Sequence, residues 1–113
     1  MNKEKLNIGI FTNNYHKALK FFTNLYHDKR QEIDLYRNTK TIQEIILLNS
    51  TQYLWINLID NSKEYKCESV LGYRCDKAYI DKSINEELIE EVIIPTLCHS
   101  GRKGTLKEAM IYF

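Results

Sequence analysis

The stretch from Gly72 to Leu97 reads GYRCDKAYIDKSINEELIEEVIIPTL and places an apolar run, an aspartate and a helix in quick succession. The run Ala78–Ile80 is typical of a buried strand, and Asp81 follows it directly. Ser83 and Glu86 have the spacing of a capping box, so we expect a helix to begin here. The residues expected on its buried face are Leu88, Ile89, Val92, Ile93 and Leu97.

The N-terminal half predicts a strand, a helix and three further strands. Leu6–Phe11 is apolar and rich in β-branched residues, and Thr12–Asn14 has helix-cap chemistry. Apolar residues at helical spacing predict an amphipathic helix over Tyr15–His27. We expect the three further strands at Gln31–Arg37, Thr41–Leu48 and Gln52–Ile59, of which the last two form a hairpin. A final strand is expected in the C-terminal half, at Glu108–Phe113.

These elements predict a single domain over residues 1–113 of the α/β (or α+β) class, with one small mixed sheet and two main helices packed on it. Strand–helix–strand pieces favour this arrangement because each helix must bury its apolar face against the sheet. The residues that we expect in the core are Phe22, Ile46, Trp55, Ile80, Val92 and Ile93.

Composition excludes several classes of protein. The chain has 113 residues, is 43% apolar and carries a formal net charge of +1, so no global charge attracts it to nucleic acid. There is no apolar run of about eighteen residues that could span a membrane, and the N-terminus lacks the features of a signal peptide. Three cysteines, an odd number, suit a reducing cytosol, so we expect a cytoplasmic protein.

The place for a phosphate-binding loop lies between the first strand and the first helix. It reads GIFTNNYHK from Gly9 to Lys17, with one glycine and no Gly-Lys-Ser/Thr, which argues against nucleotide hydrolysis. Asp81 at the end of a strand could hold magnesium through water, which makes Lys17 and Asp81 the nucleotide or metal candidates. A hydrolytic site would want a second acid, but the next residue is Lys82. The alternative is that Asp81 favours the start of the following helix electrostatically.

Metal-ligating and nucleophilic patterns are weak. Cys67, Cys75, Cys98 and His99 contain no paired C-x-x-C spacing, so we predict no zinc site and interpret the cysteines as buried or half-buried thiols. No Ser, His and Asp set has a recognisable local frame for acyl transfer. We therefore predict no catalytic residues and no cofactor, magnesium at Asp81 being the exception.

Two basic segments and several tyrosines are candidates for binding surfaces. The basic residues are Lys29, Arg30, Arg37 and Lys40 in the first segment and Arg102, Lys103 and Lys107 in the second. Acidic residues interrupt the first segment, so a solvated face is the alternative to nucleic-acid binding. Tyrosines often supply binding energy at protein–protein interfaces, and the candidates here are Tyr36, Tyr53, Tyr65 and Tyr73.

From Leu6 to Leu97 the chain resembles a shortened ATPase domain of phage terminase large subunits. The likeness lies in the opening NIGIFTNNYHKALKFF, the hairpin ILLNSTQYLWINL and the stretch GYRCDKAYID. The resemblance implies that Asp81 matches the magnesium-binding aspartate and that Lys82 replaces the catalytic glutamate. With the phosphate loop also missing, it implies a relative that does not hydrolyse nucleotides.

The N-terminal half also resembles a module of the glyoxalase/bleomycin-resistance superfamily. LNIGIFTNNYHKALKFFTNLY looks like its opening strand and helix, and TIQEIILLNSTQYLWINLID looks like its later hairpin. That resemblance implies a small-molecule-binding protein with a cavity between paired sheets in a dimer. Asn7 occupies the place of an early metal ligand, and asparagine is a poor ligand there.

We therefore expect a non-catalytic binding protein of phage or mobile-element type. Its expected partner is a host nucleic-acid-processing or defence enzyme, which it would inhibit in the manner of an anti-CRISPR protein. The alternatives are a magnesium-dependent nucleotide-binding module, a nucleic-acid-binding protein and a glyoxalase-type binding protein. The oligomeric state stays open, with a homodimer among the alternatives, and no membrane partner is expected.

Overall fold

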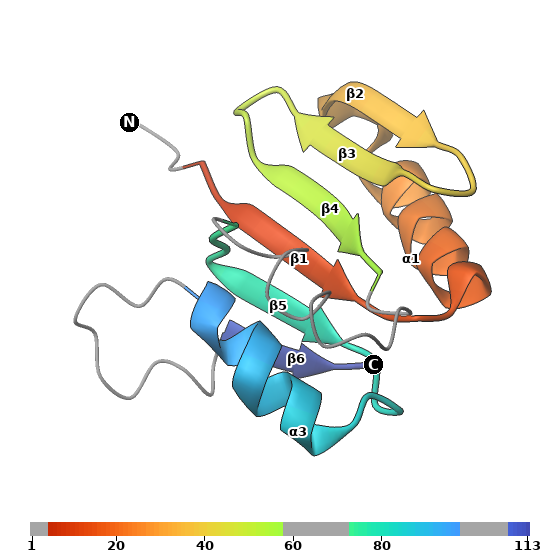
Figure 1. The fold of residues 1–113 in the computed structure, drawn as a ribbon. Helices are drawn as coiled ribbons and strands as arrows, with labels where there is room; N and C mark the ends of the chain where they lie inside the picture. The colour runs from red at the N-terminus through yellow and green to blue at the C-terminus, as the bar shows by residue number, and fades with distance from the viewer. Residues whose placement is uncertain (1–4, 58–72, 98–108) are drawn as a thin grey trace.

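A six-stranded mixed sheet forms the centre of the structure, a computed structural model that describes residues 5–57, 73–97 and 109–113 (Figure 1). The strand order is β2-β3-β4-β1-β5-β6. β1 is parallel to β4 and β5, β5 is parallel to β6, and β3 is antiparallel to both β2 and β4. The strands are β1 (Asn7–Phe11), β2 (Ile33–Asn38), β3 (Gln43–Leu47), β4 (Gln52–Ile56), β5 (Lys77–Ile80) and β6 (Met110–Tyr112).

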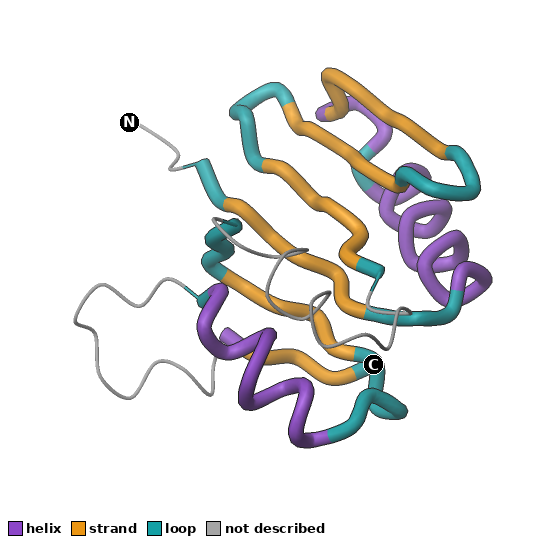
Figure 2. The backbone as a smooth tube through the Cα atoms, in the orientation of Figure 1, coloured by secondary structure: helices purple, strands orange, loops and turns teal. Residues whose placement is uncertain are grey.

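Helices cover opposite faces of this sheet (Figure 2). α1 (Tyr15–Asp28) follows β1, and a short 3₁₀ turn (Arg30–Glu32) leads from it into β2. α3 (Glu86–Leu88) continues as a π-helical turn (Ile89–Ile93) and a 3₁₀ turn (Ile94–Thr96). The mixed sheet with two helices confirms the predicted fold class.

The alternation of side chains along each strand divides the core between the two faces. On β1, Ile8 and Ile10 pack toward α1, whereas Phe11 packs toward α3. On β4, Trp55 lies on the α1 side and Ile56 on the α3 side, as the period-two pattern of the sequence predicts. The buried residues of the α3 side are Phe11, Ile56, Cys75, Ala78, Ile80, Ile84, Ile89, Val92, Ile93 and Leu97.

Five of the six predicted core residues are buried, and the prediction for Ile46 is wrong. Ile46 is half-buried because Gln43, Ile45 and Leu47 are the β3 residues that face α1. An isoleucine-rich strand does not reveal which of its two faces the helix covers, so the sequence could not separate Ile45 from Ile46.

The predicted capping box is also wrong. The helix begins at Glu86 and its N-cap is Asn85, whose side-chain oxygen accepts a hydrogen bond from the Glu87 amide at 2.6 Å. Ser83 instead bonds to Asp81. Pro95 lies in the final 3₁₀ turn, consistent with a proline that kinks or ends the last turn.

Candidate functional site

Asp81 lies directly after β5, and its carboxylate is enclosed by donors from three residues. Thr12 Oγ1 donates to Asp81 Oδ2 at 2.7 Å. Lys17 Nζ lies 2.7 Å from Asp81 Oδ1 and forms an ion pair with it. The amide and hydroxyl of Ser83 donate to the same Oδ1 at 2.9 Å and 3.0 Å. Asp81 is only 1% exposed, so these bonds satisfy a carboxylate that water does not reach.

Short-range structure at the start of α1 positions Thr12 and Lys17. Asn14 is the N-cap of the helix, and its side-chain oxygen accepts hydrogen bonds from the amides of His16 and Lys17. The Asn14 amide donates to Thr12 Oγ1 at 3.0 Å, which leaves the Thr12 hydroxyl proton for Asp81. The Trp55 indole donates to the Thr12 carbonyl at 2.9 Å and fixes the same turn from β4.

Burial raises the pKa of the Asp81 carboxyl, but the hydrogen bonds from Lys17, Ser83 and Thr12 outweigh burial and lower the pKa to about 2. The carboxylate is therefore charged at neutral pH and bound to the Lys17 ammonium. Lys17 is the accessible residue of the pair, because its side chain is 43% exposed. Its Nζ also lies 5.8 Å from the centre of the Phe113 ring. We name the set Thr12, Lys17, Asp81 and Ser83 the Asp81 cluster.

The Asp81 cluster lies where ligands bind in many open α/β sheets. β1 and β5 are adjacent and parallel, and their chains continue to helices on opposite faces (Figure 1). The crevice at the carboxyl ends of two such strands is the usual ligand site of a doubly wound fold. Here the hydrogen bond from Thr12 at the end of β1 to Asp81 at the end of β5 joins the two strand ends.

This geometry limits the chemistry of the Asp81 cluster. Asp81 is the residue that could hold a hydrated magnesium ion, but its four short contacts already use both of its oxygens. Over the described ranges, no three His, Cys, Asp or Glu side chains gather in a way that could hold a metal ion. The cluster therefore links β1, α1 and β5 through hydrogen bonds and an ion pair within the chain, and it leaves the Lys17 ammonium group accessible.

The structure brings together the two nucleotide or metal candidates, Lys17 and Asp81, and adds Thr12 and Ser83, which the sequence analysis missed. The signal for Thr12 was available, because it directly follows the first strand and Asp81 directly follows a strand that could lie beside it. The interpretation of Asp81 as the electrostatic start of a helix is wrong. The helix begins at Glu86, and Asp81 instead accepts from Ser83 in the turn before it.

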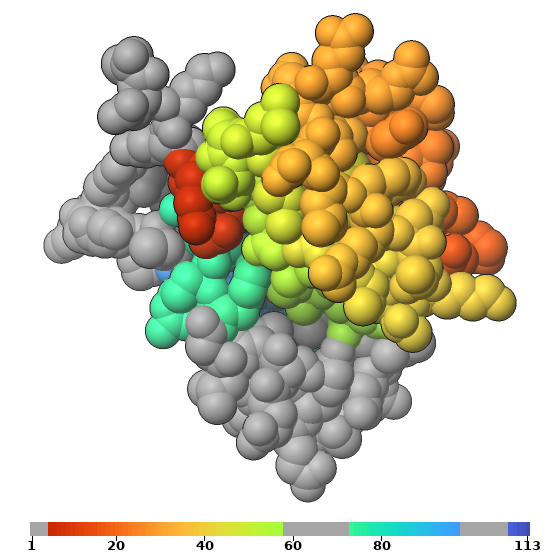
Figure 3. Space-filling view, turned by 90° about the horizontal axis from the view of Figure 1, so that it is seen from above, coloured from red at the N-terminus to blue at the C-terminus, as the bar shows by residue number. Residues whose placement is uncertain are grey.

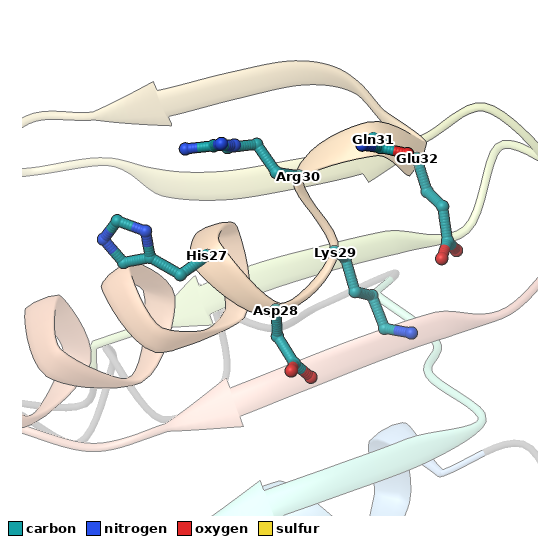
Figure 4. Close-up of a pocket in the computed structure, with 6 residues that line it drawn as sticks. All are labelled: His27, Asp28, Lys29, Arg30, Gln31 and Glu32. Carbon is teal, nitrogen blue, oxygen red and sulfur yellow. The ribbon is translucent and has the colours of Figure 1, made fainter.

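The first basic segment does not form one patch. Lys29 and Arg30 lie in a shallow depression of about 490 Å³ at the end of α1, lined by residues 27–32. Figure 4 shows that their side chains extend in different directions. Arg37 lies on β2 with its Nε 3.5 Å from Oε1 of Glu44, and Lys40 is exposed in the β2–β3 turn. Arg102, Lys103 and Lys107 lie outside the described residues.

The candidate interface tyrosines are half-buried where the structure describes them. Tyr36 stacks on Tyr26 of α1 with ring centres 4.7 Å apart. Tyr53 packs on the α1 side of the sheet, and burial raises the pKa of its hydroxyl. The Tyr73 hydroxyl is buried beside Gly9, and this burial raises its pKa. It has no hydrogen-bond partner among the described residues. Tyr65 lies outside the described ranges.

Of the cysteines, Cys75 is buried in the α3-side core, and Cys67 and Cys98 lie outside the described residues. No described helix is long and apolar enough to cross a membrane. Comparison of the chain with protein-family models, with curated proteins and with solved structures found no match.

Proposed function

We propose that this protein is a non-catalytic binding protein. The observation that carries the proposal concerns the Asp81 carboxylate at the carboxyl end of β5. Both of its oxygens already accept hydrogen bonds from donors of the same chain. The missing Gly-Lys-Ser/Thr loop and the lysine at position 82 support the same conclusion, because neither a phosphate cradle nor a second acid accompanies Asp81. The resemblance to a terminase ATPase domain without its catalytic parts agrees with it.

The partner that we propose is a host nucleic-acid-processing or defence enzyme, bound by a phage or mobile-element protein that acts as an inhibitor. The support is an α/β fold that lacks the phosphate-binding loop and the second acid beside Asp81, together with a composition rich in Asn, Lys, Ile and Tyr that is typical of AT-rich coding sequences. In this role the Asp81 cluster only stabilises the frame.

The test is the mass of the purified protein in solution by light scattering, alone and after incubation with extract of a bacterial host. A stable complex that contains an enzyme acting on nucleic acid, and that inhibits this enzyme when rebuilt from purified components, is the expected result. A protein that leaves the extract at its own mass would contradict the proposed partner. Lys17→Ala is the control, because the proposal predicts that this substitution leaves complex formation intact.

The exposure of Lys17 favours a second candidate function, which is non-hydrolytic binding of a nucleotide. A half-exposed ammonium group beside Asp81, at the carboxyl ends of β1 and β5, is placed where a phosphate group would approach. Calorimetric titration with ATP and magnesium chloride tests this candidate. Binding that Lys17→Ala abolishes and that Lys20→Ala, one turn further along α1, leaves intact would support it.

The glyoxalase-type reading is the remaining alternative, and light scattering tests it as well. It requires a dimer with a cavity between paired sheets. In this chain β5 occupies the edge of β1 opposite to β4, and β6 extends the sheet further. Because the glyoxalase-type interpretation requires a dimer, a monomeric mass would count against it. The host-enzyme proposal requires only a complex with the host enzyme.

A further inference from the structure

The outer face of α1 carries a line of basic and polar side chains, and the helix ends in the exposed acidic residue Asp28. From Tyr15 to His27 the helix contains no Asp or Glu. His16, Lys20, Asn24 and His27 are all exposed, and their spacing of four, four and three residues places them in one line along the helix. Eleven residues of α-helix span about 16 Å, which is long enough for a few nucleotides of a single strand.

The line continues beyond the end of α1. Figure 4 shows the side chains of His27 and Arg30 extending toward the same side of the junction between α1 and β2. Asp28, Lys29 and Glu32 extend away from that side. The side chains of Asp28, Lys29 and Glu32 therefore extend away from that of Arg30, although all four residues line the same depression. Asp34 lies exposed on β2.

Aromatic rings lie beside this end of the helix. The rings of Tyr26 and Tyr36 are stacked, with centres 4.7 Å apart and planes inclined by 20°. His27 meets Tyr26 edge-on at 5.5 Å. The space-filling view shows the orange surface of α1 and β2 running into the yellow-orange β2–β3 turn without a break (Figure 3). Half-buried rings beside cationic side chains are the elements with which proteins bind single strands, by stacking bases and pairing phosphates.

We propose that this surface, formed by His16, Lys20, Asn24, His27 and Arg30 with the Tyr26–Tyr36 stack, binds single-stranded nucleic acid without sequence preference. Lys20 and Arg30 contact phosphates, and Tyr36 contacts a base at the sheet edge. The competing interpretation is a solvated helix face. This inference concerns a surface separate from the Asp81 cluster and does not depend on the proposed partner.

The test is fluorescence anisotropy of labelled twelve-residue oligo-dT and oligo-U at several salt concentrations. With two phosphate contacts, the logarithm of the association constant should fall with the logarithm of salt concentration with a slope of about −1.4. The double variant Lys20→Glu/Arg30→Glu should weaken binding about tenfold or more. Its matched control, Lys29→Glu/Lys82→Glu, changes the net charge equally on side chains outside the surface and should weaken binding far less.

Tyr36 tests the stacking contribution separately. Tyr36→Phe keeps the ring and should retain binding, whereas Tyr36→Leu should lose about fivefold or more. Circular dichroism of each variant checks that the fold is intact. No binding of either oligonucleotide at low salt would overturn the inference, and so would an equal loss in the two double variants. Equal binding of duplex DNA, with no effect of Tyr36→Leu, would overturn its single-strand specificity.

Discussion

At the scale of single residues, Asp81 links pH to stability. Its pKa falls from an ordinary value of 3.8 to about 2 in the folded protein, because the hydrogen bonds from Lys17, Ser83 and Thr12 outweigh its burial. The folded state therefore binds this proton less tightly than the unfolded state. The resulting stabilisation, about 2 kcal/mol, is fully present above about pH 4 and is lost as pH falls toward 2.

Urea unfolding of the natural protein and of Asp81→Asn between pH 2 and pH 7 measures this contribution. At pH 7 the variant should be less stable by about 2 kcal/mol, and the difference should close at the acid end of the range. Asp28→Asn, at an exposed position on the end of α1, is the control and should change stability little. A difference that stays constant across this range of pH would show that the ion pair with Lys17 is not its source.

Gly9 allows two rings to lie against the middle of β1. A Cβ atom at this position would lie 2.8 Å from Cε1 of Phe11 and 3.3 Å from the Tyr73 hydroxyl. Phe11 is fully buried and cannot move aside cheaply. Gly9→Ala should therefore lower the free energy of unfolding by about 1–3 kcal/mol. Thermal unfolding followed by circular dichroism measures the change, and an unchanged or raised midpoint would contradict the close approach.

At the scale of elements, Asn14 fixes where α1 begins. Its side chain accepts from the amides of two residues in the first turn, so Asn14→Ala should cost about 1 kcal/mol of stability. Asn13→Ala is a matched control, because Asn13 is exposed and is not the cap. Urea unfolding of the two variants compares them. An equal cost would indicate that the start of α1 is held by tertiary packing.

The two helix starts show what the sequence could and could not predict. Thr12–Asn14 predicted a cap at α1 because a single polar run separates a strand from an amphipathic helix. At α3, both Ser83 and Asn85 could cap, and the capping-box spacing favoured Ser83. The choice depends on Asp81, which takes both the amide and the hydroxyl of Ser83 and leaves Asn85 as the cap. The Asp81–Ser83 contact is a local turn between residues two apart, and the capping-box spacing alone does not take this competing turn into account.

The same distinction applies to the sheet. Alternation along β4 places Tyr53 and Trp55 on the same face, because the period of a strand is two residues. The pairing of β1 with β5, which brings Thr12 to Asp81, joins segments 69 residues apart and depends on the whole topology. Lys17 and Asp81 were therefore predictable as candidates from their residue types. The ion pair between them, and the hydrogen bonds that occupy the Asp81 carboxylate, were not predictable.

At the scale of the whole molecule, the two halves of the core share one sheet. Phe22 anchors the α1 side and Ile93 the α3 side, and both are fully buried. Because β1 contributes side chains to both faces, loss of packing on one face should destabilise the other. Phe22→Ala and Ile93→Ala should each lower the free energy of unfolding by about 2–5 kcal/mol. Each variant should still unfold in a single cooperative transition.

Trp55 provides the probe that separates this expectation from independent unfolding of the two faces. It is the one tryptophan of the chain and is buried on the α1 side, so its fluorescence reports that face. Circular dichroism reports the helices of both faces. For Ile93→Ala the two signals should change at the same urea concentration, because the α3-side core cannot be lost while β1 stays packed. A loss of helical signal before the Trp55 fluorescence changes would instead show that the α3 side unfolds alone, with the Asp81–Lys17 contact opening at that step.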